Sequence, residues 1–366
     1  MRFSRHLPVR KRKAAWKKLK NMKTEIFDLK TEYDEGLETA AKAIADGKLV
    51  GFPTETVYGL GADAMNEEAV RSIYAAKGRP SNNPLIVHIY KFEQLYALVS
   101  EVPEKAEKLL RVFWPGPFTA VLNKKPEVND TVSGGLKTVA VRMPAHAMAR
   151  ELIKRSGKLI AAPSANLSGK PSPTTAQHVI DDFMGKIPVI LDGGSADVGL
   201  ESTVCDLRGD TPIVLRPGGV TAEMIRSVAG DVMISPGVLE ELKEGEKALS
   251  PGMLYKHYSP KAEVFLAMGG EEKELAGRIN ILYDKCIKEG RKSEIFCMEA
   301  SRSLYGERNC RLLGKNAEEI AASLFSELRL ADERGVEVVL FEGLSTDGIG
   351  LAVMNRMIRA AGFKLI

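Results

Sequence analysis

Polar side chains of several kinds are concentrated between Gly51 and His88, in two stretches that read GFPTETVYGLGADA and KGRPSNNPLIVH. They supply two hydroxyls, a carboxylate, two cations, an amide and an imidazole, from Thr54, Thr56, Glu55, Lys77, Arg79, Asn83 and His88. Apolar runs that can build a core flank these groups. Such a density of polar groups beside core-forming segments is typical of a preformed pocket for a small molecule.

Two further arginines stand where contact with an anion is favoured. Arg142 lies inside the otherwise apolar run TVAVRMP, and Arg216 directly precedes a Pro-Gly-Gly turn at the end of a predicted strand. A buried arginine is costly unless it meets a carboxylate or another anion. Strand ends beside turns are also where α/β proteins commonly hold their ligands. Both arginines are therefore candidates for a binding site.

Other polar residues have plainer alternatives. Lys77 and Arg79 could clamp an anionic substrate, or could only add favourable charge at the C-terminus of a helix. A lone histidine on a strand, such as His88, is more often structural than catalytic. The segment PSANLSGKPSP lets backbone N–H groups approach a phosphate, or it forms an ordinary turn. Its small and polar residues are Ser164, Asn166, Ser168, Gly169 and Ser172.

No motif for an activated nucleophile accompanies these groups. The chain has no Walker A run, no HExxH and no GxSxG. Arginines and small hydroxyls without a nucleophile indicate phosphoryl or nucleotidyl transfer, in which positioning and charge neutralisation lower the barrier.

Alternating helices and strands must position these residues. Apolar periodicity and capping signals predict helices over 33–48, 67–76, 103–112, 146–156, 174–183 and 221–229. Short apolar runs predict strands over 49–52, 85–89, 118–122, 138–143, 189–192, 204–207 and 213–215. Residues 59–64 formally match the G-x-G-x-x-A dinucleotide fingerprint, but Arg79 stands about where the ribose-binding acid should be. We reject the fingerprint and expect these glycines to form a tight turn close to a ligand.

The composition changes after residue 231. Residues 233–260 are predicted to be a linker, and their aromatic side chains, among them Tyr255 and Tyr258, favour a lid ordered over a site. Strands over 262–267 and 336–341 and helices over 317–332 and 351–361 then predict a smaller α/β domain of about 100 residues. The predicted organisation is a basic N-terminal extension (1–24), a first α/β domain (25–232), the linker and a second domain (261–366).

Charge is unevenly distributed along the 366 residues. The net charge is +4, but residues 1–21 carry nine Lys or Arg and no acid, which leaves 43 bases against 48 acids elsewhere. The basic segment could bind nucleic acid, or it is a solvated leader or lies upstream of a natural start at Met22. The four cysteines form no CxxC pair, which argues against zinc or a disulfide framework and favours a reducing, cytoplasmic setting. No apolar run reaches the roughly 18 residues that a bilayer requires.

Six motifs occur in an order that resembles the YrdC-like family. They are PTETVYGLG, KGRPSNNPLIVH, TVAVRMP, PSANLSG, STV with its downstream Asp206, and LRPG. The segments PGMLYKHYSP and GIGLAVMNRMIRAA are similar to the long, two-domain form of that family, the L-threonylcarbamoyladenylate synthases. The resemblance covers residues 25–366. It implies a twisted, mostly open α/β sheet with a concave, positively charged surface, followed by a Rossmann-like domain.

The resemblance also implies a reaction. L-threonine, bicarbonate or CO2, and ATP would give threonylcarbamoyl-AMP and pyrophosphate. The product would pass to the machinery that threonylcarbamoylates the adenosine beside the anticodon of tRNA. Mg2+ would accompany ATP, although no acidic cluster in the sequence marks a protein site for this metal.

Roles for individual residues follow from the same resemblance. L-threonine would be held by Thr56, His88, Arg142, the backbone of Ala162, and Ser202. ATP would be held by Arg79, Asn83, Thr138, Ser164, Ser172 and Arg216. The catalytic cations would be Lys77, Arg79 and Arg142, of which the last would pair with the threonine carboxylate bidentately. Tyr255 would close over the pocket as a lid and shield a hydrolysis-prone acyl-adenylate from water.

Two rival functions remain open from the sequence. A non-catalytic RNA-binding module of the same fold would use the basic segment, but the acidic remainder of the chain argues against a strongly basic RNA-binding face. A carbamoyl-transfer enzyme related to hydrogenase maturation proteins would share part of the pocket. Those proteins carry acylphosphatase-like and Cys-rich zinc segments, and nothing like either is found here.

Overall fold

The computed structural model describes residues 23–240 and 258–366. The basic residues 1–22 and most of the predicted lid, Tyr255 included, lie outside the described residues. Within the two described ranges, no helix is both long enough and apolar enough to cross a membrane.

The first domain is built on a mixed sheet. Its described strands are β1 (Glu25–Asp28), β2 (Val50–Phe52), β3 (Gly59–Asp63), β4 (Ile86–His88), β5 (Phe118–Asn123), β6 (Thr138–Arg142), β7 (Ile160–Ala161), β8 (Val189–Asp192), β9 (Thr203–Asp206), β10 (Ile213–Arg216) and β11 (Met233–Ile234). They lie in the order β1-β8-β2-β3-β7-β4-β6-β5-β9-β10-β11. β4 and β6 pair in parallel, whereas β5 and β6 are antiparallel. The central strands, which carry His88 and Arg142, are buried.

Several described helices of the first domain begin at a side chain that caps their first turn. The described helices of this domain are α2 (Tyr33–Ala45), α3 (Glu67–Lys77), α4 (Glu104–Phe113), α5 (Asp130–Ser133), α6 (Ala147–Ser156), α7 (Ala176–Phe183) and α8 (Ala222–Ala229), with short 3-10 turns at Phe92–Ala97 and Pro236–Val238. In α3 the Asn66 side chain caps the first turn, and Gly78 ends the helix in the left-handed conformation, with φ of 65°. This turn sends the chain back toward the sheet and leaves Lys77 buried under the helix end.

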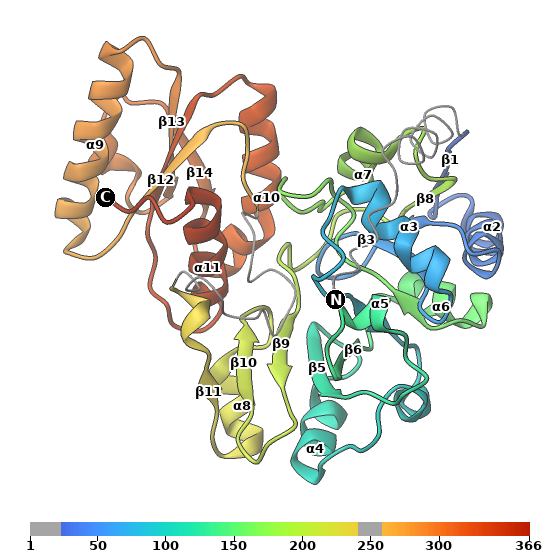
Figure 1. The fold of residues 1–366 in the computed structure, drawn as a ribbon. Helices are drawn as coiled ribbons and strands as arrows, with labels where there is room; N and C mark the ends of the chain where they lie inside the picture. The colour runs from blue at the N-terminus through green and yellow to red at the C-terminus, as the bar shows by residue number, and fades with distance from the viewer. Residues whose placement is uncertain (1–22, 241–257) are drawn as a thin grey trace, which may run out of the picture.

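The second domain is a four-stranded parallel sheet covered by helices. The strands β12 (Glu263–Ala267), β13 (Ser293–Met298), β14 (Cys310–Gly314) and β15 (Val338–Glu342) lie in the order β12-β15-β13-β14. The helices are α9 (Glu272–Lys288), α10 (Ala317–Glu333) and α11 (Gly350–Ala361), with a 3-10 turn at Arg302–Tyr305. α10 and α11 lie on the side that faces the first domain, and α9 lies on the far side (Figure 1). The predicted α/β fold with a second, Rossmann-like domain is confirmed.

The two domains are joined through buried contacts. Val57 and Leu200 of the first domain belong to the same apolar cluster as Phe325 and Val353 of the second. The chain enters the second domain at Tyr258, whose ring stacks on Phe325 with 5.1 Å between centroids. The cavity described below therefore lies close to the domain boundary.

The predicted turn over residues 59–64 is wrong, because these residues begin with strand β3. A Cβ on Gly59 or Gly61 would lie 2.9 Å from the ring of Phe52 on the neighbouring strand. These two glycines therefore permit close packing of β3 on Phe52 rather than a turn. Since the motif lies within a strand instead of joining a strand to a helix, the rejection of a dinucleotide fingerprint is confirmed.

Candidate active site

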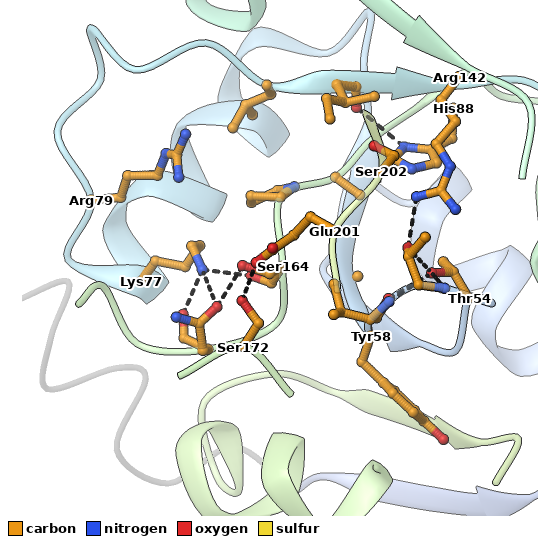
Figure 2. Close-up of a pocket in the computed structure, with 18 of the residues that line it drawn as sticks. Thr54, Tyr58, Lys77, Arg79, His88, Arg142, Ser164, Ser172, Glu201 and Ser202 are labelled. Atoms are coloured by element: carbon orange, nitrogen blue, oxygen red, sulfur yellow. Dashed lines mark hydrogen bonds between the residues drawn. The ribbon is translucent and has the colours of Figure 1, made fainter. Parts of the chain in front are cut away.

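A cavity opens where strand ends and loops of the first domain converge (Figure 2). The space that its walls outline, open solvent at the mouth included, is about 750 Å3. The polar and charged residues that line it are Thr54, Thr56, Tyr58, Lys77, Arg79, His88, Arg142, Ser164, Asn166, Ser168, Ser172, Glu201, Ser202, Arg216 and Tyr258. Its polar and charged lining suits a ligand with several charged groups.

The turn between β2 and β3 presents the threonine hydroxyls. Thr54 donates its hydroxyl to the carbonyl of Val57 at 2.6 Å and accepts the backbone N–H of Thr56 at 3.2 Å. The two threonine Oγ1 atoms are 2.8 Å apart. Side-chain bonds of this kind hold a short turn rigidly. The Thr56 side chain is thereby fixed beside the end of β6.

Arg142 ends β6 and is held on three sides. Its Nη1 donates to Oγ1 of Thr56 at 2.8 Å and its Nε to the carbonyl of Gly116 at 3.3 Å. Its Nη2 lies 2.7 Å from Oε1 of Glu55, and both side chains are almost completely buried. Although burial acts to raise the pKa of Glu55, Arg142 and the backbone N–H of Ala145 lower it. Glu55 is therefore ionised, and the guanidinium has a fixed orientation at the cavity wall.

His88 lies next to Arg142 in the parallel register of β4 and β6. Its Nδ1 is 3.2 Å from the carbonyl of Ile86, and its ring meets the edge of Phe52. Burial and the charge of Arg142 lower the pKa of His88 to about 3. The imidazole is therefore neutral near pH 7 and offers a ligand a neutral polar group.

Lys77 holds the loop that follows β7. Its Nζ donates to the carbonyls of Ser164 and Asn166, both at 2.5 Å, and lies 3.4 Å from Oδ1 of Asn166. The Ser164 hydroxyl donates to the same Oδ1 at 2.6 Å. Burial is the main cause that holds the pKa of Lys77 well below its usual value. Three donors of an ammonium group face three oxygens, so Lys77 fixes the shape of this loop.

The cavity's other wall is formed around Ser202. Arg216 donates through Nε and Nη2 to the carbonyl of Ser202 at 3.1 and 2.9 Å, and through Nη2 to its hydroxyl at 3.2 Å. The Ser202 hydroxyl lies 2.8 Å from that of Thr119. Ser172 donates to Oε1 of Glu201 at 2.5 Å. This wall therefore combines the hydroxyls of Ser172 and Ser202 with a buried carboxylate and a buried arginine.

Ten of the residues predicted from the sequence line this one cavity. They are Thr56, Lys77, Arg79, His88, Arg142, Ala162, Ser164, Ser172, Ser202 and Arg216. Figure 2 places Arg79 and Arg142 on opposite sides of it. Asn83 and Thr138 are not among the lining residues: the carbonyls of Asn83 and Pro84 accept from Arg79, and Thr138 begins β6 at the end away from Arg142. Their roles in ATP binding stay predictions, as does the lid function of Tyr255.

Several lining residues are not marked by the sequence. Glu201 directly precedes Ser202 in a loop that carries no sign of a buried charge, and Tyr58 lies in an apolar strand-like run. The ring of Tyr58 points away from the cavity, and its hydroxyl donates to the carbonyl of Gly194 at 2.6 Å (Figure 2). Tyr258 is the exception, because the aromatic content of the predicted linker is a usable signal.

The lining residues do not form a site of their own for Mg2+. Within residues 23–240 and 258–366, no group of three or more His, Cys, Asp or Glu side chains could hold a metal ion. Glu201, the carboxylate that lines the cavity, is already bonded to Ser172 and to an arginine of the second domain.

Comparisons with known proteins match both domains. The family model Sua5_yciO_yrdC, described as "Telomere recombination", matches residues 42–218, and that of "Threonylcarbamoyl-AMP synthase, C-terminal domain" matches residues 220–362. The threonylcarbamoyl-AMP synthase of Pyrococcus abyssi is 49% identical over 344 residues, which cover 94% of this chain and 99% of that protein. The threonylcarbamoyl-AMP synthase of Bacillus subtilis is 44% identical over 352 residues, with 95% and 99% covered.

Solved structures agree with the sequence comparisons. Sua5 of P. abyssi in complex with L-threonine has a TM-score of 0.84 and 50% identity, over 90% of this chain and 95% of that one. A doubly substituted variant of the same protein has a TM-score of 0.88 and 48% identity, over 94% and 98% of the two chains.

Proposed function

Since the chain belongs to the Sua5/YciO/YrdC family, in its two-domain threonylcarbamoyl-AMP synthase form, we infer that it makes threonylcarbamoyl-AMP and pyrophosphate from L-threonine, bicarbonate or CO2, and ATP. The protein is an enzyme, and the reaction makes it a nucleotidyltransferase. The observation that carries the proposal is that one cavity joins Arg142, His88 and Thr56 to Arg79, Ser172 and Arg216.

L-threonine binds at the end of the cavity formed by β4 and β6. Its carboxylate meets Arg142, which has N–H groups left after its bonds to Thr56 and Glu55. Neutral His88 and the hydroxyls of Thr56 and Ser202 line the same part of the cavity. A neutral imidazole suits this position, because a second cation would repel the threonine ammonium group.

The chemistry has two steps, which begin once the threonine ammonium group has lost a proton to solvent. The free amine attacks CO2 and releases a second proton to solvent, or it attacks the carbonyl carbon of bicarbonate, in which case the amine proton leaves in the expelled water; either path gives the N-carboxylate. An oxygen of that carbamate then attacks the α-phosphorus of ATP, and the bond to the bridging oxygen of pyrophosphate breaks. Negative charge builds on the phosphate oxygens, and fixed cations such as Arg79 and Arg216 stabilise it without reorganisation.

ATP enters as its complex with Mg2+, so the metal is part of the substrate. The carboxylate of Glu201 at the cavity wall is already bonded to Arg356 and Ser172. The product is a mixed anhydride that reacts with water. We propose that it passes to the enzyme that transfers threonylcarbamoyl to adenosine in tRNA, in the cytoplasm where ATP and tRNA are found together.

The test is pyrophosphate release from Mg2+ and ATP by the purified protein, with each substrate omitted in turn. Release that requires both L-threonine and bicarbonate, with threonylcarbamoyl-AMP identified by mass spectrometry, is expected. Release that needs neither, or tight RNA binding without release, would overturn the proposal and leave the RNA-binding module in its place.

A further inference from the structure

An arginine of the second domain reaches the wall of the cavity in the first. Arg356, on α11, is completely buried. Its Nε donates to Oε2 of Glu201 at 3.0 Å, and its Nη1 donates to the carbonyl of Pro217 at 2.6 Å. Pro217 directly follows Arg216, so the guanidinium touches both sides of the wall described above. Glu201 in turn accepts the hydroxyl of Ser172 at 2.5 Å.

A second arginine supports the same loop from behind. Arg329, on α10, donates through Nε and Nη2 to the carbonyl of Pro171 at 3.1 and 2.7 Å. Its Nη2 also lies 2.9 Å from Oδ2 of the buried Asp182. The peptide group that precedes Ser172 is therefore fixed by a side chain of the other domain.

Charge gives Arg356 a further function besides packing. The Glu201 side chain is buried and lines the cavity. Arg356 and Arg216 lower its pKa against the effect of burial, so it carries a negative charge. A carboxylate beside the position proposed for ATP would repel this polyanionic ligand, unless a cation compensates it at contact distance. Arg356 is the cation that contacts the carboxylate, and Arg216 adds positive charge at the same wall.

We propose that Arg356 is a positioning residue for the nucleotide, which acts from the second domain through Glu201 on Ser172. The proposal rests on the function proposed above, in which Ser172 is part of the ATP site. It gives the second domain a definite function: it completes the electrostatics of the cavity. Without Arg356, Glu201 would lose the guanidinium that is bonded to its carboxylate.

The experiment compares steady-state kinetics of Arg356→Gln with those of the intact protein. Loss of one partner of a buried charge pair is expected to raise the KM for ATP by at least about tenfold. The KM for L-threonine should change by less than about twofold, because Arg142 and His88 make no bond to Arg356. Arg356→Lys keeps the charge and should recover part of the loss.

A double substitution separates this function from a general loss of structure. In Arg356→Gln with Glu201→Gln, no uncompensated charge remains, so the KM for ATP should be lower than in Arg356→Gln alone. The matched control is Arg334→Gln, which breaks an Arg–Glu pair inside the second domain, with 2.6 Å between Nη2 of Arg334 and Oε2 of Glu294. This control should leave both KM values unchanged.

Two results would overturn the inference while the enzyme itself remains active. One is an equal rise of the KM values for ATP and L-threonine in Arg356→Gln. The other is a double variant in which the loss measured by the KM for ATP equals the summed losses of the two single variants. Absence of threonine-dependent pyrophosphate release in the unsubstituted protein would instead overturn the proposed function.

Discussion

Arg142 and Glu55 form a buried ion pair at the cavity wall, with 2.7 Å between Nη2 and Oε1. The anion that a buried arginine requires is thus supplied by the protein before any ligand binds. Glu55 in turn accepts the backbone N–H of Ala145 at 3.0 Å. This pair orients the guanidinium and leaves its remaining N–H groups for the carboxylate of L-threonine.

Glu55→Gln should make the stability of the protein depend on L-threonine. Breaking a buried pair leaves Arg142 uncompensated, which destabilises the ligand-free protein by about 3–5 kcal/mol. A bound threonine carboxylate restores a partner, so saturating L-threonine should raise the melting temperature more in this variant than in the unsubstituted protein. Glu107→Gln, which removes the partner of Arg111 on the surface of α4, is the control and should behave like the unsubstituted protein. Equal threonine-induced shifts in all three proteins would count against the assignment.

Arg142→Ala should weaken L-threonine binding far more than ATP binding. A bidentate arginine–carboxylate contact is among the stronger polar interactions, so the threonine dissociation constant should rise by at least about tenfold. Titration calorimetry with each ligand separately measures both constants. Arg150→Ala, on the exposed side of α6, serves as the control. Similar losses for both ligands would show that Arg142 supports the whole cavity rather than the threonine site.

The sequence predicts local structure and the set of cavity residues better than it predicts their partners. Asn66 and Gly78 mark both ends of α3, because caps act within one turn of the helix. The exposed Ile281 interrupts the polar face of α9, and the patterns do not predict that helix. The sequence wrongly predicts a turn over residues 59–64. Glycine is needed there because a Cβ would clash with the ring of Phe52 on the neighbouring strand, and a sequence pattern does not show a contact between strands.

Charge pairing over long separations is the part that sequence patterns miss. Glu201 and Arg356 are 155 residues apart and belong to different domains, yet they form one buried pair. Glu55 and Arg142 are likewise brought together only by the sheet. From the sequence, each of these residues taken alone would be interpreted as a solvated charge or as a ligand contact. Only the fold shows that two of the charges compensate each other.

His88 should make the protein less stable as the pH falls below about 6.5. Its folded pKa is lowered to about 3 by burial and by Arg142, so below an ordinary histidine pKa the unfolded chain binds a proton that the folded protein does not. The contribution of His88 to the free energy of unfolding is complete above about pH 6.5. It falls by about 1.4 kcal/mol per pH unit as the pH decreases toward 3. Urea denaturation of the unsubstituted protein and of His88→Asn between pH 7.5 and 5 measures the difference.

The same comparison has an internal control. His178 also has a lowered pKa, about 4, and it makes the same contribution to the pH dependence of the unfolding free energy in both proteins. The KM for L-threonine should show no inflection near pH 6.5, since the His88 ring stays neutral. Identical slopes of unfolding free energy against pH in the two proteins would contradict the buried, neutral state.

Lys77→Met should impair ATP binding with only a modest change in stability. Two carbonyls lose a donor, at about 1–3 kcal/mol each, but a buried charge is removed, and these effects oppose one another. The loop that carries Ser164 then loses its fixed shape. The KM for ATP and the urea midpoint measure the two effects separately, with the exposed Lys48→Met as control. A large loss of stability with an unchanged KM would show that Lys77 serves the fold alone.

Ser172 should contact a hydrogen-bond donor of the nucleotide rather than a phosphate oxygen. Its hydroxyl proton is committed to the ionised Glu201, at 2.5 Å, so only its lone pairs can face a ligand. Ribose hydroxyls and the adenine amino group are donors, whereas phosphate oxygens are acceptors. In the unsubstituted protein, at least one ATP analogue that lacks the 2′-hydroxyl, the 3′-hydroxyl or the amino group should bind more weakly than ATP. Ser172→Ala should abolish that discrimination, because the acceptor is gone while the phosphate contacts remain. If Ser172→Ala weakened ATP and all three analogues by the same factor, the hydroxyl would have to donate to phosphate, and Glu201 would have to be protonated in the complex.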